Sequence, residues 1–148
     1  MNPAQPPNRS VPPEQDDLVD ALVQASFVTM AVLNRIGADQ DLSLTQLRVL
    51  AILQDRRLRM NELAEYLGLD RSTMTGLVSR AEKRGLLQRA PNETDGRAVD
   101  VFLTAAGAEL AANLHHQVAQ ALSPVTDVLP PGDQRKLQSL LSRMIDRQ

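Results

Sequence analysis

Hydroxyl-bearing and basic side chains share one face of a short segment in the middle of this 148-residue chain. Asp70 is a typical helix N-cap, and apolar residues then recur at helical spacing, which predicts a helix from Arg71 to about Arg84. The face away from the apolar residues carries Ser72, Thr73, Thr75, Gly76, Ser79, Arg80 and Lys83. Short hydroxyl side chains let a helix approach the major groove of DNA closely, and arginine can bind guanine or phosphate. This face therefore indicates nucleic-acid binding.

Local charge favours the same interpretation. Between Arg71 and Arg97 there are six basic and three acidic residues, a balance of +3. The whole chain carries −2, so the remainder carries −5. Positive charge is thus concentrated in one segment, where it can attract a polyanion. The alternative is a solvated helix face, and Arg84 lies where a cation would simply favour the helix dipole.

A β-hairpin is predicted directly after this helix. Leu86–Ala90 and Arg97–Leu103 are rich in β-forming residues and flank a turn-forming cluster at 91–96. Arg89 and Arg97 add basic side chains to the hairpin, and Asp95 precedes Arg97 by two residues. An exposed ion pair between Asp95 and Arg97, worth ~0–1 kcal/mol, is the alternative to a binding role.

Helical patterns on both sides frame these elements. The sequence predicts helices at Asp17–Ile36, Ser43–Leu53, Asn61–Leu67, from Thr104 to a break at Pro124, and from about Asp133 to Arg147. Ser43 with Gln46 fits a capping box, and Gly68 and Gly85 suit helix ends. The inner face of the second helix is expected to be Leu44, Leu47, Leu50 and Ala51, and 55–59 is expected to be a polar link.

Both terminal helices carry apolar stripes that a chain of this size would not cover by itself. Leu18 and Leu22 belong to one of two stripes on the first helix, and Leu137, Leu140, Leu141 and Met144 form one on the last. A second subunit would cover them in a homodimer, and an intramolecular core is the alternative. The proline-rich residues 1–14 are expected to be a disordered tail.

Composition excludes several classes of function. Without cysteine there is no disulfide scaffold, thiolate zinc site or cysteine nucleophile, and two histidines make a metal site unexpected. Nucleotide-binding, hydrolase and metalloprotease motifs are absent, so no enzyme, cofactor or metal is predicted. Uninterrupted apolar runs fall short of the about 18 residues of a membrane helix, and no signal pattern is present. We therefore expect a soluble cytoplasmic protein without a membrane partner.

Several stretches, in this order and spacing, resemble the MarR family of bacterial transcription regulators. They are Met60-Asn61-Glu62-Leu63-Ala64, Asp70-Arg71-Ser72-Thr73-Met74-Thr75, Glu82-Lys83-Arg84-Gly85-Leu86, and Asp95-x-Arg97 leading to Leu103-Thr104-x-x-Gly107. The resemblance covers residues 42 to about 122. It implies a mainly α fold with a small β-wing. Within one domain, 15–148, residues 42–104 would form a winged helix-turn-helix lobe that binds double-stranded DNA. The helical regions 15–37 and 105–148 would form the dimer.

The resemblance also implies roles for individual residues. Ser72, Thr73 and Thr75 would face the major groove, Arg97 would enter a minor groove, and Asp95 would stabilise the wing. Together with the basic and small residues singled out above, the predicted DNA-binding set is Arg71, Ser72, Thr73, Thr75, Gly76, Arg80, Lys83, Arg89, Asp95 and Arg97. A homodimeric regulator, expected to be a repressor, would bind a pseudo-palindromic operator. Small phenolic or other lipophilic ligands often relieve DNA binding in the family, and Arg48 could anchor an anionic effector. The candidate ligand residues are Phe27, Met30, Arg48 and His115. Arg48 could instead pair with Asp17 or Asp20, and His115 could be a surface or partly buried residue. Phe27 and Met30 could instead be core residues.

Two glycines depart from the family pattern. Gly76 lies inside the recognition helix, where many relatives have a larger residue, and it costs roughly 1 kcal/mol of helix propensity against alanine. Either it permits close approach to DNA or one base contact is lost. Gly96 stands where a second wing arginine is common. These departures and the net acidity leave a second hypothesis open, a winged-helix protein-interaction module that does not bind DNA.

Overall fold

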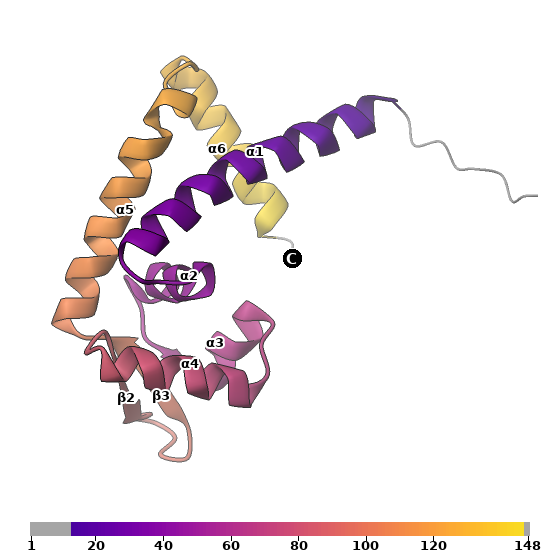
Figure 1. Ribbon diagram of the computed structural model, residues 1–148. Helices are drawn as coiled ribbons and strands as arrows, with labels where there is room; N and C mark the ends of the chain where they lie inside the picture. The colour runs from indigo at the N-terminus through magenta and orange to yellow at the C-terminus, as the bar shows by residue number, and fades with distance from the viewer. Residues whose placement is uncertain (1–12, 147–148) are drawn as a thin grey trace, which may run out of the picture. The chain divides into compact units, whose positions relative to one another are not determined.

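The computed structural model describes residues 13–146, with side chains from Asp16 onward. The helices and strands in this range follow one another as shown in Figure 1: α1 (Pro13–Asp39), α2 (Leu44–Leu53), β1 (Leu58–Arg59), α3 (Met60–Leu67), α4 (Arg71–Lys83), β2 (Leu87–Pro91), β3 (Val99–Leu103), α5 (Ala105–Thr126) and α6 (Pro131–Ile145). The predicted fold class, mainly helical with a small β-wing, is confirmed. The chain divides into two units, Met1–Ala31 and Val32–Gln148, and α1 runs from the first into the second.

The predicted helix ends are confirmed by their hydrogen bonds. Ser43 and Gln46 form a reciprocal capping box at the start of α2, with N–O distances of 3.2 and 2.8 Å. Gly68 and Gly85 adopt positive φ angles of 64° and 72°, the left-handed conformation that ends α3 and α4. The Thr104 side chain accepts a hydrogen bond from the Gly107 N–H at 3.0 Å and so begins α5.

A three-stranded antiparallel sheet forms the wing, with the strand order β1-β3-β2. Val101 of β3 lies opposite Leu58 of β1 on one side and Arg89 of β2 on the other. The prediction that residues 55–59 are only a polar link is therefore wrong at its end. Two residues of that link are enough to extend the hairpin, because the edge of β3 offers unpaired main-chain groups.

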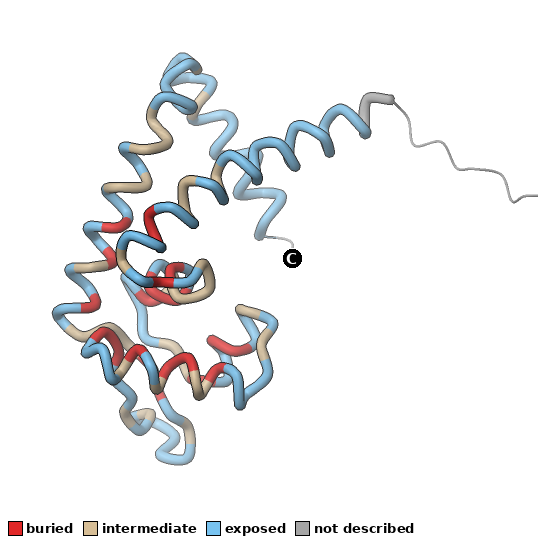
Figure 2. Tube along the Cα trace, in the orientation of Figure 1, coloured by how far each residue is buried: buried red, intermediate tan, exposed pale blue. Residues whose placement is uncertain are grey.

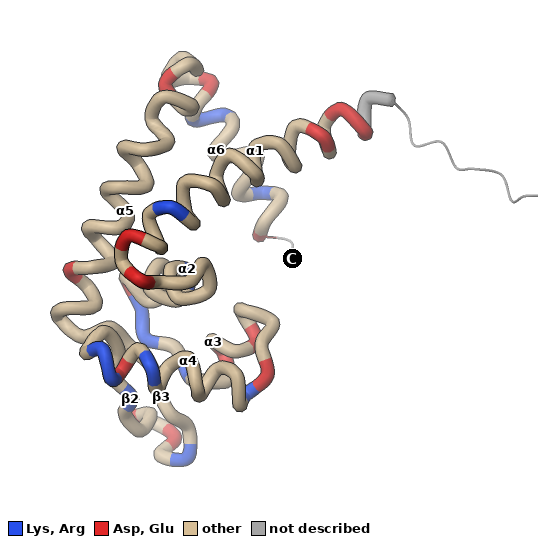
Figure 3. The backbone as a smooth tube through the Cα atoms, in the orientation of Figure 1, with Lys and Arg blue, Asp and Glu red and all other residues tan. Residues whose placement is uncertain are grey.

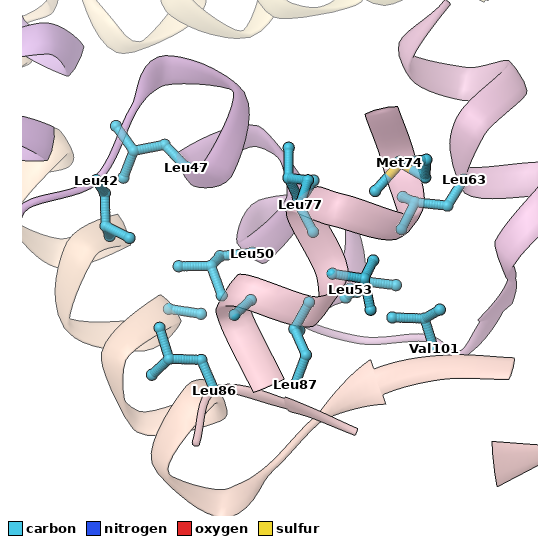
Figure 4. Close-up of a cluster of buried hydrophobic side chains, with 14 of the residues drawn as sticks. Leu42, Leu47, Leu50, Leu53, Leu63, Met74, Leu77, Leu86, Leu87 and Val101 are labelled. Atoms are coloured by element: carbon cyan, nitrogen blue, oxygen red, sulfur yellow. The ribbon is translucent and has the colours of Figure 1, made fainter. Parts of the chain in front are cut away.

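One aliphatic core holds α2, α3, α4, α5 and the sheet together. Figure 4 shows leucine, methionine and valine side chains converging from α2, α3, α4 and the sheet. From α5, Ala111 and Leu114 belong to the same core, and Figure 2 shows the buried residues along these helices. The stripe predicted for α4 is confirmed, because Met74, Leu77, Val78 and Ala81 are all buried. The inner face predicted for α2 is partly wrong, because Leu44 is half-buried and Ala51 is exposed, whereas Val49 and Leu53 are buried. The helix is covered on more than one side.

Two predictions made from prolines need correction. Pro13 and Glu14, placed in the disordered tail, belong to α1, because proline suits the first turn of a helix, where its N–H is not needed. The rest of that predicted tail, 1–12, lies outside the described residues. Pro124 does not break α5, which continues to Thr126. The carbonyl of Gln120, which Pro124 cannot bond, accepts a hydrogen bond from the Ser123 hydroxyl at 2.9 Å instead.

Apolar side chains of both terminal helices are exposed. Along α1 they include Leu18, Leu22 and Phe27, and along α6 they include Leu137, Leu140, Leu141 and Met144. By length and composition alone, Asp16–Asp39 would also suit a membrane span. The sequence analysis did not identify this helix as a possible membrane span, because it considered uninterrupted apolar runs and not the mean hydropathy of a whole helix.

Candidate nucleic-acid interface

The start of α4 is fixed by the carboxylate of Asp70. Its oxygens accept hydrogen bonds from the Thr73 N–H at 2.8 Å, the Ser72 hydroxyl at 2.9 Å and the Thr73 hydroxyl at 3.0 Å. The main-chain bond from Thr73, followed by the two hydroxyl bonds, holds the pKa of Asp70 below its ordinary value. The cap fixes the residue at which α4 begins, and the buried residues fix which side of the helix faces the core. Together they determine which side chains of α4 are exposed.

The hydroxyl groups predicted to face a groove already donate hydrogen bonds within α4. Ser72 and Thr73 donate to Asp70, and the Thr75 hydroxyl donates to the Arg71 carbonyl at 2.8 Å. Each hydroxyl oxygen keeps lone pairs that can accept a further bond. In this arrangement the three hydroxyl groups offer acceptors, which suits the amino groups of adenine and cytosine in a major groove, while Arg71, Arg80 and Lys83 supply donors.

Four arginines line one hollow between α4 and the sheet. Arg59, Arg71, Arg89 and Arg97 come from β1, α4, β2 and the wing loop, and the hollow has a volume of about 220 Å³. Its other lining residues are Met60, Asn61, Thr75, Ala98 and Val99. The fold thus brings together Arg71, Thr75, Arg89 and Arg97 from the predicted set. Figure 3 shows the basic segments of α4 and of the hairpin loop.

Arg59 is the arginine of this hollow that sequence reasoning missed. It lies outside the basic segment 71–97, in the stretch predicted to be a polar link. Pairing of Arg59 with Asp100 carries it to the sheet edge beside the hollow. The signal that could have found it is its position directly before α3, where a basic residue opens the helix-turn-helix unit.

The other basic residues near α4 lie in three different settings. Arg89 forms an ion pair with the half-buried Glu82, which holds its guanidinium beside the sheet. Arg80 and Lys83 are exposed on α4, and Arg80 reaches over Gly76, where an added Cβ would lie 3.4 Å from its Nη1. Arg84 turns away, donating hydrogen bonds to the carbonyls of Gln40 and Asp41.

The wing loop is held by side-chain bonds to its main chain. The Asp95 carboxylate accepts a hydrogen bond from the main-chain N–H of Arg97 at 3.1 Å. Within the described part of the chain, no ion pair joins the side chains of Asp95 and Arg97. The guanidinium of Arg97 therefore stays available on an exposed loop, next to the hollow.

The predicted ligand residues lie in separate places. His115 lines a hollow of about 150 Å³ with aliphatic residues of α1, α2 and α5, among them Leu33, Leu47 and Leu114. Arg48 lines another hollow, with Glu62, Glu65 and Tyr66, and forms none of the ion pairs found between residues 16 and 146. Phe27 and Met30 are exposed on the other unit. Across the same residues no cluster of His, Asp and Glu could hold a metal ion.

Comparison with known proteins decides the family. Residues 40–98 match the sequence model of the MarR family. The uncharacterized HTH-type transcriptional regulator YfiV of Bacillus subtilis (strain 168) is 31% identical over 110 residues, which cover 72% of this chain and 69% of that protein. The chain belongs to the MarR family. It is a DNA-binding transcriptional regulator, and its relatives are regulators rather than enzymes.

Solved structures of MarR-family proteins share its fold. NadR in complex with 4-hydroxyphenylacetate superposes with a TM-score of 0.73 at 26% identity, and the match covers 97% of both chains. A cysteine-to-serine mutant of MarR from E. coli, complexed with operator DNA, superposes with a TM-score of 0.68 at 25% identity. That match covers 88% of this chain and 95% of the other. The winged helix-turn-helix fold expected from the sequence is confirmed.

Proposed function

We propose that this MarR-family regulator is a cytoplasmic homodimeric repressor that acts by binding a pseudo-palindromic operator, without catalysis. The observation that carries the proposal is the convergence of Arg59, Arg71, Arg89 and Arg97 on one hollow beside the capped helix α4. Of the four guanidinium groups, that of Arg89 is paired with a carboxylate, that of Glu82. The excess positive charge that remains suits a polyanion such as DNA.

The hollow supports a specific docking arrangement. With the face of α4 in a major groove and Arg97 in the adjacent minor groove, the DNA backbone between the two grooves would cross the hollow. Arg59 and Arg71 would then bind its phosphates, because guanidinium groups match phosphate oxygens bidentately. The bases would be read by Thr75, Arg80 and the neighbouring residues of α4, and Ser72, Thr73, Gly76 and Lys83 complete the proposed contact face. Asp95 would act through the main chain of Arg97.

The exposed apolar faces of the terminal helices support a dimer. Leu137, Leu140, Leu141 and Met144 of α6 are 37–45% exposed, and Leu18 and Leu22 of α1 are also exposed. Contiguous apolar surface of this kind marks a protein or membrane interface. Two helices with such faces favour a second subunit over a bilayer, because α6, with 15 residues, is too short to span one. We assign dimerisation to 15–37 and 105–148 and DNA binding to 42–104.

A small-molecule effector is the further part of this proposal. The hollow lined by His115 is mostly apolar, with aliphatic walls from three helices that also support the lobe. An apolar hollow with a few polar groups is a typical ligand site. NadR, similar in fold, was solved with 4-hydroxyphenylacetate. Titrating 4-hydroxyphenylacetate against the operator complex, with His115→Ala as the variant, tests it, and unchanged operator affinity would remove this ligand.

DNA binding is tested by salt-dependent affinity. Bound fragments selected from sheared genomic DNA give the operator, and fluorescence anisotropy then gives Kd at several salt concentrations. Arg59→Ala and Arg97→Ala should each weaken binding, and Arg59→Ala should reduce the salt slope by about 1. Lys136→Ala, an equal change of charge on α6, is the control. No binding of duplex DNA even at low salt would contradict the proposal and favour a protein-interaction module.

A further inference from the structure

We propose that Asn92 and Asp100 are positioning residues that hold the wing tip in the conformation Arg97 needs to enter DNA. This inference rests on the proposed function and adds to it a hydrogen-bonded relay beneath the wing loop. The relay runs from the linker before β1, through Asp100 and Asn92, to the main chain of Asp95 and Arg97.

Asp100 is the fixed point of the relay. Among the residues that the structure describes, it is the one buried charged side chain, with 7% exposure. A buried carboxylate must be paired and hydrogen-bonded, since its desolvation is otherwise costly. Its Oδ1 accepts a hydrogen bond from the Asn92 Nδ2 at 2.9 Å, and its Oδ2 lies 3.6 Å from the Arg57 Nη2. Both oxygens therefore have partners, one on each side of β3.

Arg57 contacts the carboxylate oxygen of Asp100 that Asn92 does not bind. Its guanidinium carbon lies 4.1 Å from the centroid of the Phe102 ring, a cation–π contact with the same strand that carries Asp100. Asp100 itself lies opposite Arg59 on β1 and Ala90 on β2. Its carboxylate is thus held at the middle strand of the wing.

Asn92 transmits this position to the loop. Because its Nδ2 donates to Asp100, its Oδ1 is turned toward the loop, where three groups donate to it. They are the Thr94 N–H at 3.0 Å, the Thr94 hydroxyl at 2.8 Å and the Asp95 N–H at 3.0 Å. Asp95 in turn accepts from the Arg97 N–H through its side chain and from the Ala98 N–H through its carbonyl. Each residue from 94 to 98 except Gly96 is tied to this relay.

Apart from these bonds, one main-chain hydrogen bond, from the Asn92 N–H to the Ala98 carbonyl at 2.9 Å, closes the base of the loop. Residues 93–97 are all exposed, so burial contributes nothing to their conformation. Without these hydrogen bonds the loop would lose conformational entropy when it binds DNA, and that loss would weaken binding. The relay therefore affects binding through Arg97, the side chain at the wing tip that reaches the arginine-lined hollow.

A double-mutant cycle tests this. Asn92→Ala, Arg97→Ala and the double variant are compared in the full-length protein by operator Kd, with Asn113→Ala on α5 as the matched control. We expect Asn92→Ala to weaken binding about tenfold in the parent and less than twofold in the Arg97→Ala background. Asp100→Asn keeps an acceptor for Asn92 but loses the charge beside Arg57. It should also weaken operator binding, by a smaller factor than Asn92→Ala.

Amide hydrogen exchange of the free protein gives a second measurement that needs no DNA. Asn92→Ala should speed exchange of the Thr94, Asp95 and Arg97 amides and leave those of α4 unchanged. Slow exchange retained in the variant would overturn the relay, as would equal losses of affinity with and without Arg97. If Arg97→Ala weakens binding and Asn92→Ala does not, only the relay fails. If the parent binds no duplex DNA, the proposed function fails and this inference with it.

Discussion

The guanidinium Nη2 of Arg84 donates a hydrogen bond to the main-chain carbonyl of Gln40, 3.0 Å away across the turn between α1 and α2. Its Nη1 donates to the next carbonyl, that of Asp41, at 2.9 Å. The last turn of α1 has no basic residue of its own, so Arg84 provides the cation that the negative end of that helix favours. This arginine joins the end of α4 to the end of α1 and is not available to bind DNA.

Replacing Arg84 should therefore affect folding stability. We expect Arg84→Ala to lower the free energy of unfolding by about 1 kcal/mol, because two exposed charge-assisted hydrogen bonds are lost. Urea unfolding followed by circular dichroism measures the change. Lys83→Ala is the matched control, since Lys83 is an exposed neighbour for which no ion pair or side-chain hydrogen bond is found in residues 16–146. Equal unfolding midpoints for the two variants would contradict a stabilising role of the Arg84 hydrogen bonds.

Gly107 should be the glycine least tolerant of substitution. It lies in the first turn of α5, so close to the main chain of Leu86 that an added Cβ would overlap the Leu86 carbonyl oxygen. That oxygen also accepts a hydrogen bond from the Thr104 N–H, so it cannot move away freely. We expect Gly107→Ala to destabilise the protein by more than about 2 kcal/mol, as overpacking against fixed main chain does.

Gly132→Ala is the control for this substitution. Gly132 also lies in the first turn of a helix, α6, but nothing lies within 4 Å of the Cβ position there. Alanine at 132 should raise stability by several tenths of a kcal/mol, because it restricts the unfolded chain. Thermal unfolding of both variants checks the pair, and a Gly107→Ala protein as stable as the parent would refute the close approach.

Much of this fold could be predicted because capping residues and apolar stripes each determine a helix without help from distant parts of the chain. Ser43, Asp70 and Thr104 cap helices through their own side chains, and the α4 stripe from Met74 to Ala81 is one-sided. The prediction at Leu58–Arg59 failed because it depended on a distant partner: that strand exists only where β3 pairs with it. The break expected at Pro124 failed for a local reason, because the neighbouring Ser123 hydroxyl donates to the Gln120 carbonyl that proline cannot bond, and α5 continues to Thr126.

The same division applies to the candidate site. The candidate residues from Arg71 to Arg97 lie on one contiguous segment, so composition alone is enough to predict them. Arg59 was missed because tertiary pairing alone carries it to the hollow, and the relay through Asp100 was missed because a single acidic residue in a strand has no sequence signal. The bonds of Arg84 to Gln40 and Asp41 span more than 40 residues of sequence, beyond the reach of any local pattern.

Acid should remove the contribution of Asp70 to stability. Because hydrogen bonds lower its pKa in the folded protein, the ionised group stabilises the fold above its unfolded pKa. This contribution is fully present at neutral pH and is lost as the pH falls below about 4 and through the folded pKa. Asp70→Asn keeps an acceptor but cannot ionise, so its Tm should be lower than that of the parent at pH 7. The difference should narrow on acidification, and a constant difference from pH 7 to pH 3 would contradict this cause.

Substituting Gly76 decides between its two interpretations. In the free protein an added Cβ meets the Arg80 Nη1 at 3.4 Å, an ordinary contact with the end of a flexible side chain. We therefore expect Gly76→Ala to stabilise α4 by up to about 1 kcal/mol. If the glycine permits close approach of α4 to the groove, the same methyl group should weaken operator binding about tenfold, since α4 must then move away from its base contacts.

Stability and affinity should thus change in opposite directions at this position, which a general loss of structure cannot produce. Gly132→Ala, with a gain in stability and no change in Kd, is the control for the helix-propensity effect alone. Anisotropy titrations and thermal unfolding of the same preparations give both quantities. An unchanged or tighter Kd for Gly76→Ala would show that the methyl group meets no DNA, and it would favour the other interpretation, in which a larger side chain, and with it one base contact, has been lost from this helix.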